Sequence, residues 1–195
     1  MKGKGLTMER IAETAMHLVC EKGYNKFSMR ELAQELHCKA ASLYNHIESI
    51  DDINRQVGLM ASEKMDAALE AATAGKTRDE ALIALAHAYR DFVRDENELY
   101  QAIMGMPSLK MADTLAVGRD SLRVVRSVIA QYNISRAAAV NFSRSFRAAL
   151  HGFASYEVAG YYTAPEATAE NSFDFLVAGY VHWIHQIEQE EKERL

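Results

Sequence analysis

The segment over residues 27–47 constrains the fold most, because it predicts two short helices joined by a tight turn. Ser28 is a good N-cap for the first helix, and Glu31 stands where a capping box needs it. The apolar residues of the first helix share one face, and Leu43 and Ile47 repeat that pattern in the second. This arrangement is typical of the helix-turn-helix, a motif that reads DNA.

The composition of the 195-residue chain favours an all-α globular protein. Hydrophobic residues make up 49% and charged residues 25%, and only two prolines are present, so neither disorder nor a sheet protein is favoured. No apolar run approaches the roughly 20 residues that a membrane-crossing helix needs. The first residues also lack the apolar core of a secretion signal. We therefore expect a cytoplasmic protein without a membrane partner.

The charge distribution is compatible with DNA binding although the net charge is −5. Residues 1–50 carry seven Lys or Arg against six Glu, a balance of +1, and the rest of the chain carries 15 against 21, a balance of −6. Phosphate contacts depend on a local basic surface and on helix N-termini, so an acidic remainder does not exclude them. It argues against indiscriminate coating of nucleic acid.

Helical periodicity continues along the chain and predicts about nine helices. Beyond the two short ones, we expect a helix over residues 6–21 and one from residue 49 to a break at 74–75. A third opens at residue 77 and fades over 94–97, and a shorter one passes through residues 99 and 103 and ends near 105. Further helices are expected over residues 108–131, 135–160 and 166–190. The last helix is apolar on more than one side, with Phe175 and Trp183 away from the centre of its stripe. One neighbouring helix does not cover such a surface, whereas a second subunit would.

The second short helix presents small, polar and partly basic side chains that suit a DNA groove. In a helix-turn-helix, Lys39, Ala40 and Ser42 would face base edges. Tyr44 and His46 would then reach phosphate oxygens. Small residues at these positions allow close approach to the bases.

Groups before the second helix extend this candidate surface. The hydroxyl of Ser28 and the free amides beside it could hold a phosphate, and Lys2, Lys4 and Arg10 could reach a flanking groove or the backbone. The alternative is a helical hairpin with a solvated polar face. The capped pair of helices, the turn and the Leu-Tyr-x-His run together favour DNA binding.

Residues 8–55 resemble the TetR family of bacterial transcriptional regulators. The resemblance is carried by residues 33–36 and by Ser-Leu-Tyr-Asn-His-Ile-Glu-Ser over residues 42–49. His37 departs from it, because the family usually has a glycine in the turn, a left-handed position where His is among the enriched residues. Ile50 departs as well, since a lysine commonly opens the next helix there, and its absence would remove a phosphate contact.

The resemblance implies an all-α fold with an N-terminal three-helix DNA-binding domain and a larger helical domain for ligand binding and dimerisation. We accordingly expect domains over residues 1–48 and 49–195 and a homodimer formed through residues 135–160 and 166–190. A further short resemblance, Leu-His-Gly-Phe over residues 150–153, is to the Trp-His-Gly signature of one C-terminal subgroup, with Leu in place of Trp.

The family resemblance also implies a small effector in the C-terminal body. Aromatic and sulfur-containing residues there could form a pliable, partly apolar pocket, although stripes of this kind also pack helix cores. The candidate ligand-binding residues are Tyr89, Phe92, Tyr100, Met104, Met106, Met111, Phe142, Phe146 and His151.

The expected function is a ligand-responsive regulator of transcription. The resemblance alone makes it a repressor, released by a small molecule from a palindromic operator in double-stranded DNA. A dimer would place its two reading helices about 34–36 Å apart, and an effector that prefers another separation would lower operator affinity through residues 49–72. Two alternatives remain open: a helical ligand-binding dimer without operator recognition, and a cofactor-free enzyme centred on His151.

The remaining polar clusters are assigned to structure. Cys20 and Cys38 are the only cysteines, expected as buried free thiols, with a redox pair as the alternative. His182 and His185 have a spacing that suits metal ligands near Glu188, but no Cys or Asp completes the set. No nucleophile elbow, phosphate loop or metalloprotease pattern is found, so we expect no metal, no cofactor and no enzyme.

Overall fold

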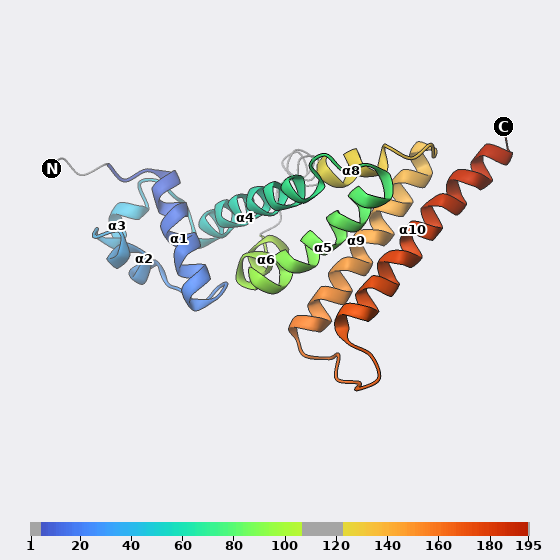
Figure 1. Cartoon of the computed structure of the whole chain (residues 1–195). Helices are drawn as coiled ribbons and strands as arrows, with labels where there is room; N and C mark the ends of the chain where they lie inside the picture. The colour runs from blue at the N-terminus through green and yellow to red at the C-terminus, as the bar shows by residue number, and fades with distance from the viewer. Residues whose placement is uncertain (1–4, 107–122, 195) are drawn as a thin grey trace. The chain divides into compact units, whose positions relative to one another are not determined.

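The computed structural model describes residues 5–106 and 123–194, and every regular element in these ranges is an α-helix (Figure 1). The predicted all-α fold with about nine helices is confirmed for this part of the chain. The start of the helix expected over residues 108–131 lies outside it. The helices are α1 (Met8–Lys22), α2 (Met29–Glu35), α3 (Ala40–Leu43), α4 (Ile50–Thr73), α5 (Arg78–Asp95), α6 (Asn97–Met104), α8 (Arg123–Ile129), α9 (Arg136–Val158) and α10 (Ala169–Glu193).

The described residues form two compact units. Unit 1 comprises residues 5–64 and 96–106, and unit 2 comprises residues 65–95 and 123–194. Helix α4 contributes to both, because the division falls between Lys64 and Met65. None of the helices in the two units combines the length and apolarity that crossing a membrane requires.

Unit 1 is built around α1, whose apolar stripe, with Ile11, Ala15 and Leu18, is buried. Thr7 caps this helix by accepting the Arg10 amide at 3.2 Å, and Gly23 ends it with a φ of 102°. The following loop is tied to α6, because the Tyr24 amide donates to Glu98 at 2.8 Å and the Tyr24 hydroxyl donates to the Gly105 carbonyl at 2.6 Å. A Cβ at Gly105 would collide with the Tyr24 ring, so this contact requires glycine.

Unit 2 is a helical body in which α5 packs against α8, α9 and α10. Helices α9 and α10 run antiparallel and are joined by residues 159–168 (Figure 1). Phe142, Phe146 and Phe173 are fully buried in its core. The last helix begins three residues later than predicted, since Thr168 caps it by accepting the Asn171 amide at 3.1 Å.

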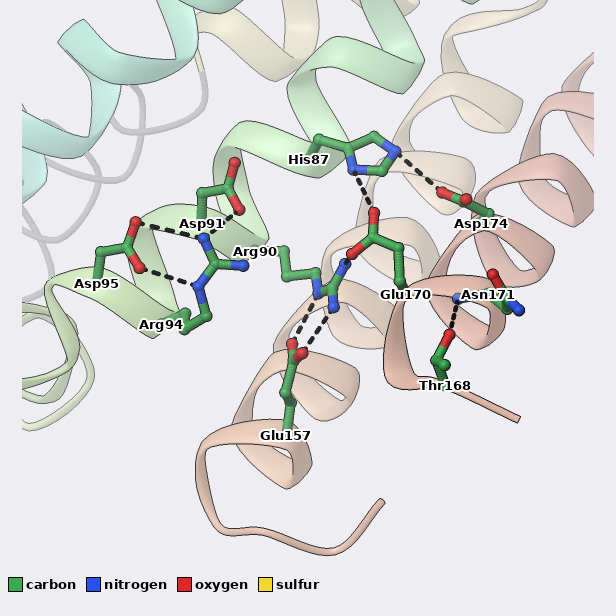
Figure 2. Close-up of polar contacts among 10 residues, drawn as sticks. All are labelled: His87, Arg90, Asp91, Arg94, Asp95, Glu157, Thr168, Glu170, Asn171 and Asp174. Atoms are coloured by element: carbon green, nitrogen blue, oxygen red, sulfur yellow. Dashed lines mark hydrogen bonds and ion pairs between the residues drawn. The ribbon is translucent and has the colours of Figure 1, made fainter. Parts of the chain in front are cut away.

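A buried arginine joins three helices of unit 2 (Figure 2). The Arg90 side chain on α5 is 4% exposed and donates two hydrogen bonds to Glu157 on α9, at 2.7 and 2.6 Å. It also donates to Glu170 on α10 at 2.5 Å, and its guanidinium lies 4.8 Å from the centre of the Phe173 ring. The hydrogen bonds to Glu157, and then those to Glu170, raise the pKa of Arg90. The core of unit 2 therefore contains a charged group that is fully paired.

Candidate nucleic-acid interface

The predicted capping box at the start of α2 is confirmed. The Ser28 hydroxyl accepts the Glu31 amide at 3.3 Å, and the Ser28 amide donates to the Glu31 carboxylate at 2.9 Å. Lys22 on α1 donates to the same carboxylate at 2.6 Å. This bond from Lys22, followed by those from Ser28, lowers the pKa of Glu31 to about 2. Three groups thus fix where α2 begins.

The turn after α2 takes the left-handed conformation that the sequence predicted. His37 has a φ of 53°, and its amide donates to the Gln34 carbonyl at 3.0 Å. The next amide, of Cys38, donates to the Ala33 carbonyl at 2.9 Å. A glycine would adopt this conformation without strain, whereas His is one of the non-glycine residues enriched in it. The turn geometry therefore tolerates the substitution at this position.

The second helix is anchored by one face. This helix, α3, is short and comprises only Ala40–Leu43. It is followed by a tight turn in which the His46 amide donates to the Leu43 carbonyl at 2.8 Å. Leu43 is 0% exposed and Ile47 is 4% exposed. Their burial in unit 1 holds the remaining faces of this short helix toward the solvent.

The residues expected to contact DNA lie on those remaining faces. Tyr44 is 57% exposed, and Ser28, Lys39 and His46 are also exposed. Ala40 and Ser42 are half-buried, and Lys4 lies outside the described residues. Lys39 occupies the N-cap position of α3 without a side-chain capping bond.

Two further polar residues accompany this surface and were not among the predicted DNA contacts. Asn45 is exposed in the tight turn that follows α3, between the buried Leu43 and Ile47. Arg55 on α4 lines a cleft of about 530 Å³ with Tyr44 and His46. Its guanidinium lies 3.6 Å from Asp52, and its Nε is buried without a partner among the described residues. Asn45 could have been found from its place between these two apolar positions, whereas Arg55 required the fold.

The candidate ligand-binding residues are distributed over both units. In unit 2, Phe142 and Phe146 are 0% exposed, and their rings stack with centres 5.7 Å apart. Tyr89 and Phe92 are also buried, and His151 is half-buried. In unit 1, Tyr100 is buried, Met104 is 54% exposed and Met106 is half-buried, whereas Met111 lies outside the described residues. Most of these side chains pack helices, as the alternative reading of the stripe expects.

The cysteine expectation is wrong in one respect. Cys20 is exposed and Cys38 is half-buried, although both are free thiols. Cys20 follows Val19, the last buried residue of α1, and the helical rotation turns it away from the core.

His182 and His185, whose spacing alone would suit two metal ligands, lie in different surroundings. His185 lies 2.9 Å from Asp79, and His182 is exposed. A different group, His87, Glu170 and Asp174, has ligand atoms within 4.8 Å of one another (Figure 2). However, the two ring nitrogens of His87 face separate carboxylates, and Glu170 is already paired with Arg90. A metal needs donors that converge on one point, so these residues form an ion-pair network.

Comparison with known proteins identifies both parts of the chain. Residues 11–57 match the domain described as bacterial regulatory proteins of the tetR family, and residues 82–180 match the tetracyclin repressor-like C-terminal domain. An uncharacterized HTH-type transcriptional regulator, Rv0681 of Mycobacterium tuberculosis, is 30% identical over 156 residues, which cover 80% of this chain and 72% of that protein.

Solved structures share the fold. A protein of unknown function from Rhodococcus sp. RHA1 superposes with a TM-score of 0.74 at 20% identity, over 93% of this chain and 96% of the other. AibR, solved in complex with isovaleryl coenzyme A and operator DNA, superposes with a TM-score of 0.58 at 19% identity, over 87% and 95% of the two chains. The chain therefore belongs to the TetR family of bacterial regulatory proteins, which are ligand-responsive, DNA-binding regulators of transcription.

Proposed function

We propose that the chain is a repressor that binds a nearly palindromic operator as a homodimer and leaves it when a small molecule binds. The observation that carries this proposal is the anchored second helix of unit 1. Leu43 and Ile47 are buried, whereas Lys39 and Tyr44 are exposed beside them. The operator complex of AibR, a protein of the same fold, supports this reading.

The DNA contacts divide into reading and positioning. Lys39, Ala40 and Ser42 would face base edges, where small side chains allow the helix to approach closely. Tyr44 and His46 would bind phosphate oxygens beside the groove. Phosphate contacts set the register of the protein on the duplex and make binding sensitive to salt.

Three further groups complete the proposed interface. The start of α2 offers the backbone amides beside Ser28 to a phosphate, although the Ser28 hydroxyl itself donates to Glu31 at 2.8 Å, and Lys4 would reach the flanking groove. Arg55 would supply a cation close to Tyr44, because both line the same cleft. The charge of Arg55 would compensate for the absence of the lysine that the family commonly has at the start of α4, where this chain has Ile50.

The proposed dimer forms through α9 and α10, within residues 135–160 and 166–190. On α10, Phe175 is 83% exposed and Trp183 is 40% exposed, and Gly179 between them has no atom near the position of a Cβ. Gly152 on α9 is equally open. Large apolar side chains beside open glycines suit close packing of helices from a second copy related by a two-fold axis.

The proposed effector pocket lies in the C-terminal body, whose domain we place at residues 49–195. Tyr89, Phe92, Phe142 and Phe146 would give it apolar walls, and His151 would give it a polar group. The effector would act by preferring a dimer in which the two reading helices no longer match successive turns of DNA. Residues 49–72, within and just before α4, would transmit this preference.

A binding experiment tests the DNA-reading surface. A labelled palindromic fragment selected from the source genome is titrated with the full chain at several salt concentrations. We expect Tyr44→Ala and Lys39→Glu to abolish the complex, and we expect Tyr161→Ala and Lys192→Glu to leave it unchanged. Tyr161 is a matched control because it is 69% exposed and lies between α9 and α10. Binding that is insensitive to salt, or that survives both first variants, would contradict the proposed surface.

A further inference from the structure

The α8–α9 region carries a basic surface that neither the proposed DNA contacts nor the proposed effector pocket uses. Residues 121–156 contain five arginines and neither Asp nor Glu, in a chain with 27 acidic residues and a net charge of −5. Every cation in this segment is an arginine rather than a lysine. Positive charge therefore accumulates on one part of an otherwise acidic protein.

Four of these arginines line one groove. Arg126 on α8 and Arg136, Arg144 and Arg147 on α9 surround a space of about 400 Å³. The same groove is lined by apolar side chains, among them Ile129 and Val140. Val140 is 42% exposed and lines this groove. A volume in this range is typical of small-ligand sites.

Three of the groove arginines have side chains without a partner in the described part of the chain. The guanidinium groups of Arg136, Arg144 and Arg147 form no hydrogen bond or ion pair with any residue in 5–106 or 123–194. The other arginines of unit 2 differ in this respect, as Arg78 is paired with Glu188 and Arg90 with Glu157. Arg123 on α8, which lies outside the groove, is paired with Glu70. Unpaired cations thus coincide with the groove.

We propose that the α8–α9 groove binds an amphipathic anion, a small molecule with a phosphate or similar dianionic head and an apolar tail. Guanidinium groups bind phosphate oxygens in pairs of parallel hydrogen bonds, and three of them supply enough positive charge and enough donors to neutralise and bind a dianionic head. Ile129 and Val140 offer an apolar surface that inorganic phosphate alone would leave exposed. Both parts of the ligand are therefore needed for full affinity.

This site is distinct from the effector pocket considered above, since none of its lining residues is among those assigned to that pocket. The inference therefore does not depend on operator release. Direct binding to the full chain tests it, and a repressor without this activity would leave the proposed function intact.

Calorimetric titration with hexyl phosphate is the test, with hexanol and inorganic phosphate as matched probes. We expect saturable binding of hexyl phosphate, at least roughly tenfold weaker binding of inorganic phosphate, and no binding of hexanol. The variant Arg144→Gln/Arg147→Gln should weaken hexyl phosphate binding by at least roughly tenfold, and Arg136→Gln should weaken it separately. Arg123→Gln removes the same charge from α8 outside the groove and should leave the affinity unchanged.

Each contrary result overturns the inference. Absence of saturable binding by the folded full chain removes the site, including the case in which other residues of the chain or of a second copy cover the groove. Equal affinity for hexyl and inorganic phosphate removes the apolar subsite. If Arg123→Gln and the double variant lose the same affinity for hexyl phosphate, the binding reflects the overall charge of the protein and not the groove. Circular dichroism of each variant confirms that the helices are retained.

Discussion

The buried pair of Arg90 and Glu157 gives the sharpest prediction about stability. Arg90 is 4% exposed and Glu157 17% exposed, and two hydrogen bonds of 2.7 and 2.6 Å join them. Removing one member of such a buried pair costs about 3–5 kcal/mol, because the other charge remains without its partner. For Glu157→Gln we expect a loss of stability at the lower limit, about 3 kcal/mol, because the ion pair with the more exposed Glu170 still neutralises Arg90. In a protein of this size, that loss lowers Tm by about 6–12 °C.

Trp183 allows the loss of stability to be measured in unit 2, the unit that contains Arg90 and Glu157. It is the only tryptophan and lies on α10 of unit 2, so its fluorescence follows the unfolding of the body that contains the pair. Measurements at one fixed protein concentration separate the effect from a change in assembly. The exposed pair of Arg94 and Asp95 is the matched control.

Two comparisons decide the result. Asp95→Asn should cost less than about 0.5 kcal/mol, as exposed ion pairs contribute little. The double variant Arg90→Met/Glu157→Leu should recover most of the loss, because it removes both charges and fills the space with apolar side chains. A Glu157→Gln variant as stable as Asp95→Asn would show instead that the Arg90–Glu157 pair behaves as a solvated one.

Three further predictions concern α2 and the dimer. Ser28→Ala should lower the stability of unit 1 by about 1 kcal/mol in urea unfolding, because α2 loses its N-cap. The pKa of Glu31 is lowered from 4.5 to about 2. The stability that its carboxylate contributes is therefore complete above pH 4.5 and is lost as the pH falls toward 2. Hydrogen exchange of the Ser28 backbone amide should become faster as the pH falls through that window. In Glu31→Gln, the side-chain amide can still accept the capping bond but does not titrate, so the exchange rate of the Ser28 amide should not show this added pH dependence. Phe175→Glu should convert the dimer to monomers in sedimentation, whereas Tyr161→Glu should not; a Phe175→Glu dimer of full affinity would exclude this face.

Local features of the fold could be predicted from the sequence, because they depend on neighbouring residues. The capping box of Ser28 with Glu31 involves positions three apart, and the turn at His37 follows from the break in a short apolar pattern, whereas its left-handed conformation was implied by the family resemblance. The same applies to the burial of Leu43 and Ile47, which share one helical face. These features define the candidate DNA-reading surface.

Distant contacts could not be predicted in this way. Arg90 and Glu157 are 67 positions apart, and Tyr24 and Gly105 are 81 apart, so no spacing rule relates them. The α8–α9 groove was missed for the same reason, because its arginines gather only once the helices pack. Cys20 was misjudged since apolar character alone did not show which way it faces.

Footprinting on an operator selected from the source genome tests whether this chain reads DNA through the second helix of unit 1. We expect two protected half-sites related by two-fold symmetry, with centres about 10–10.5 base pairs apart or a multiple of that spacing. Lys39→Glu should remove both half-sites at once, because the two subunits present the same helix. DNA reading by this helix is excluded if no genomic fragment is protected at low salt, or if protection is asymmetric and persists in Lys39→Glu.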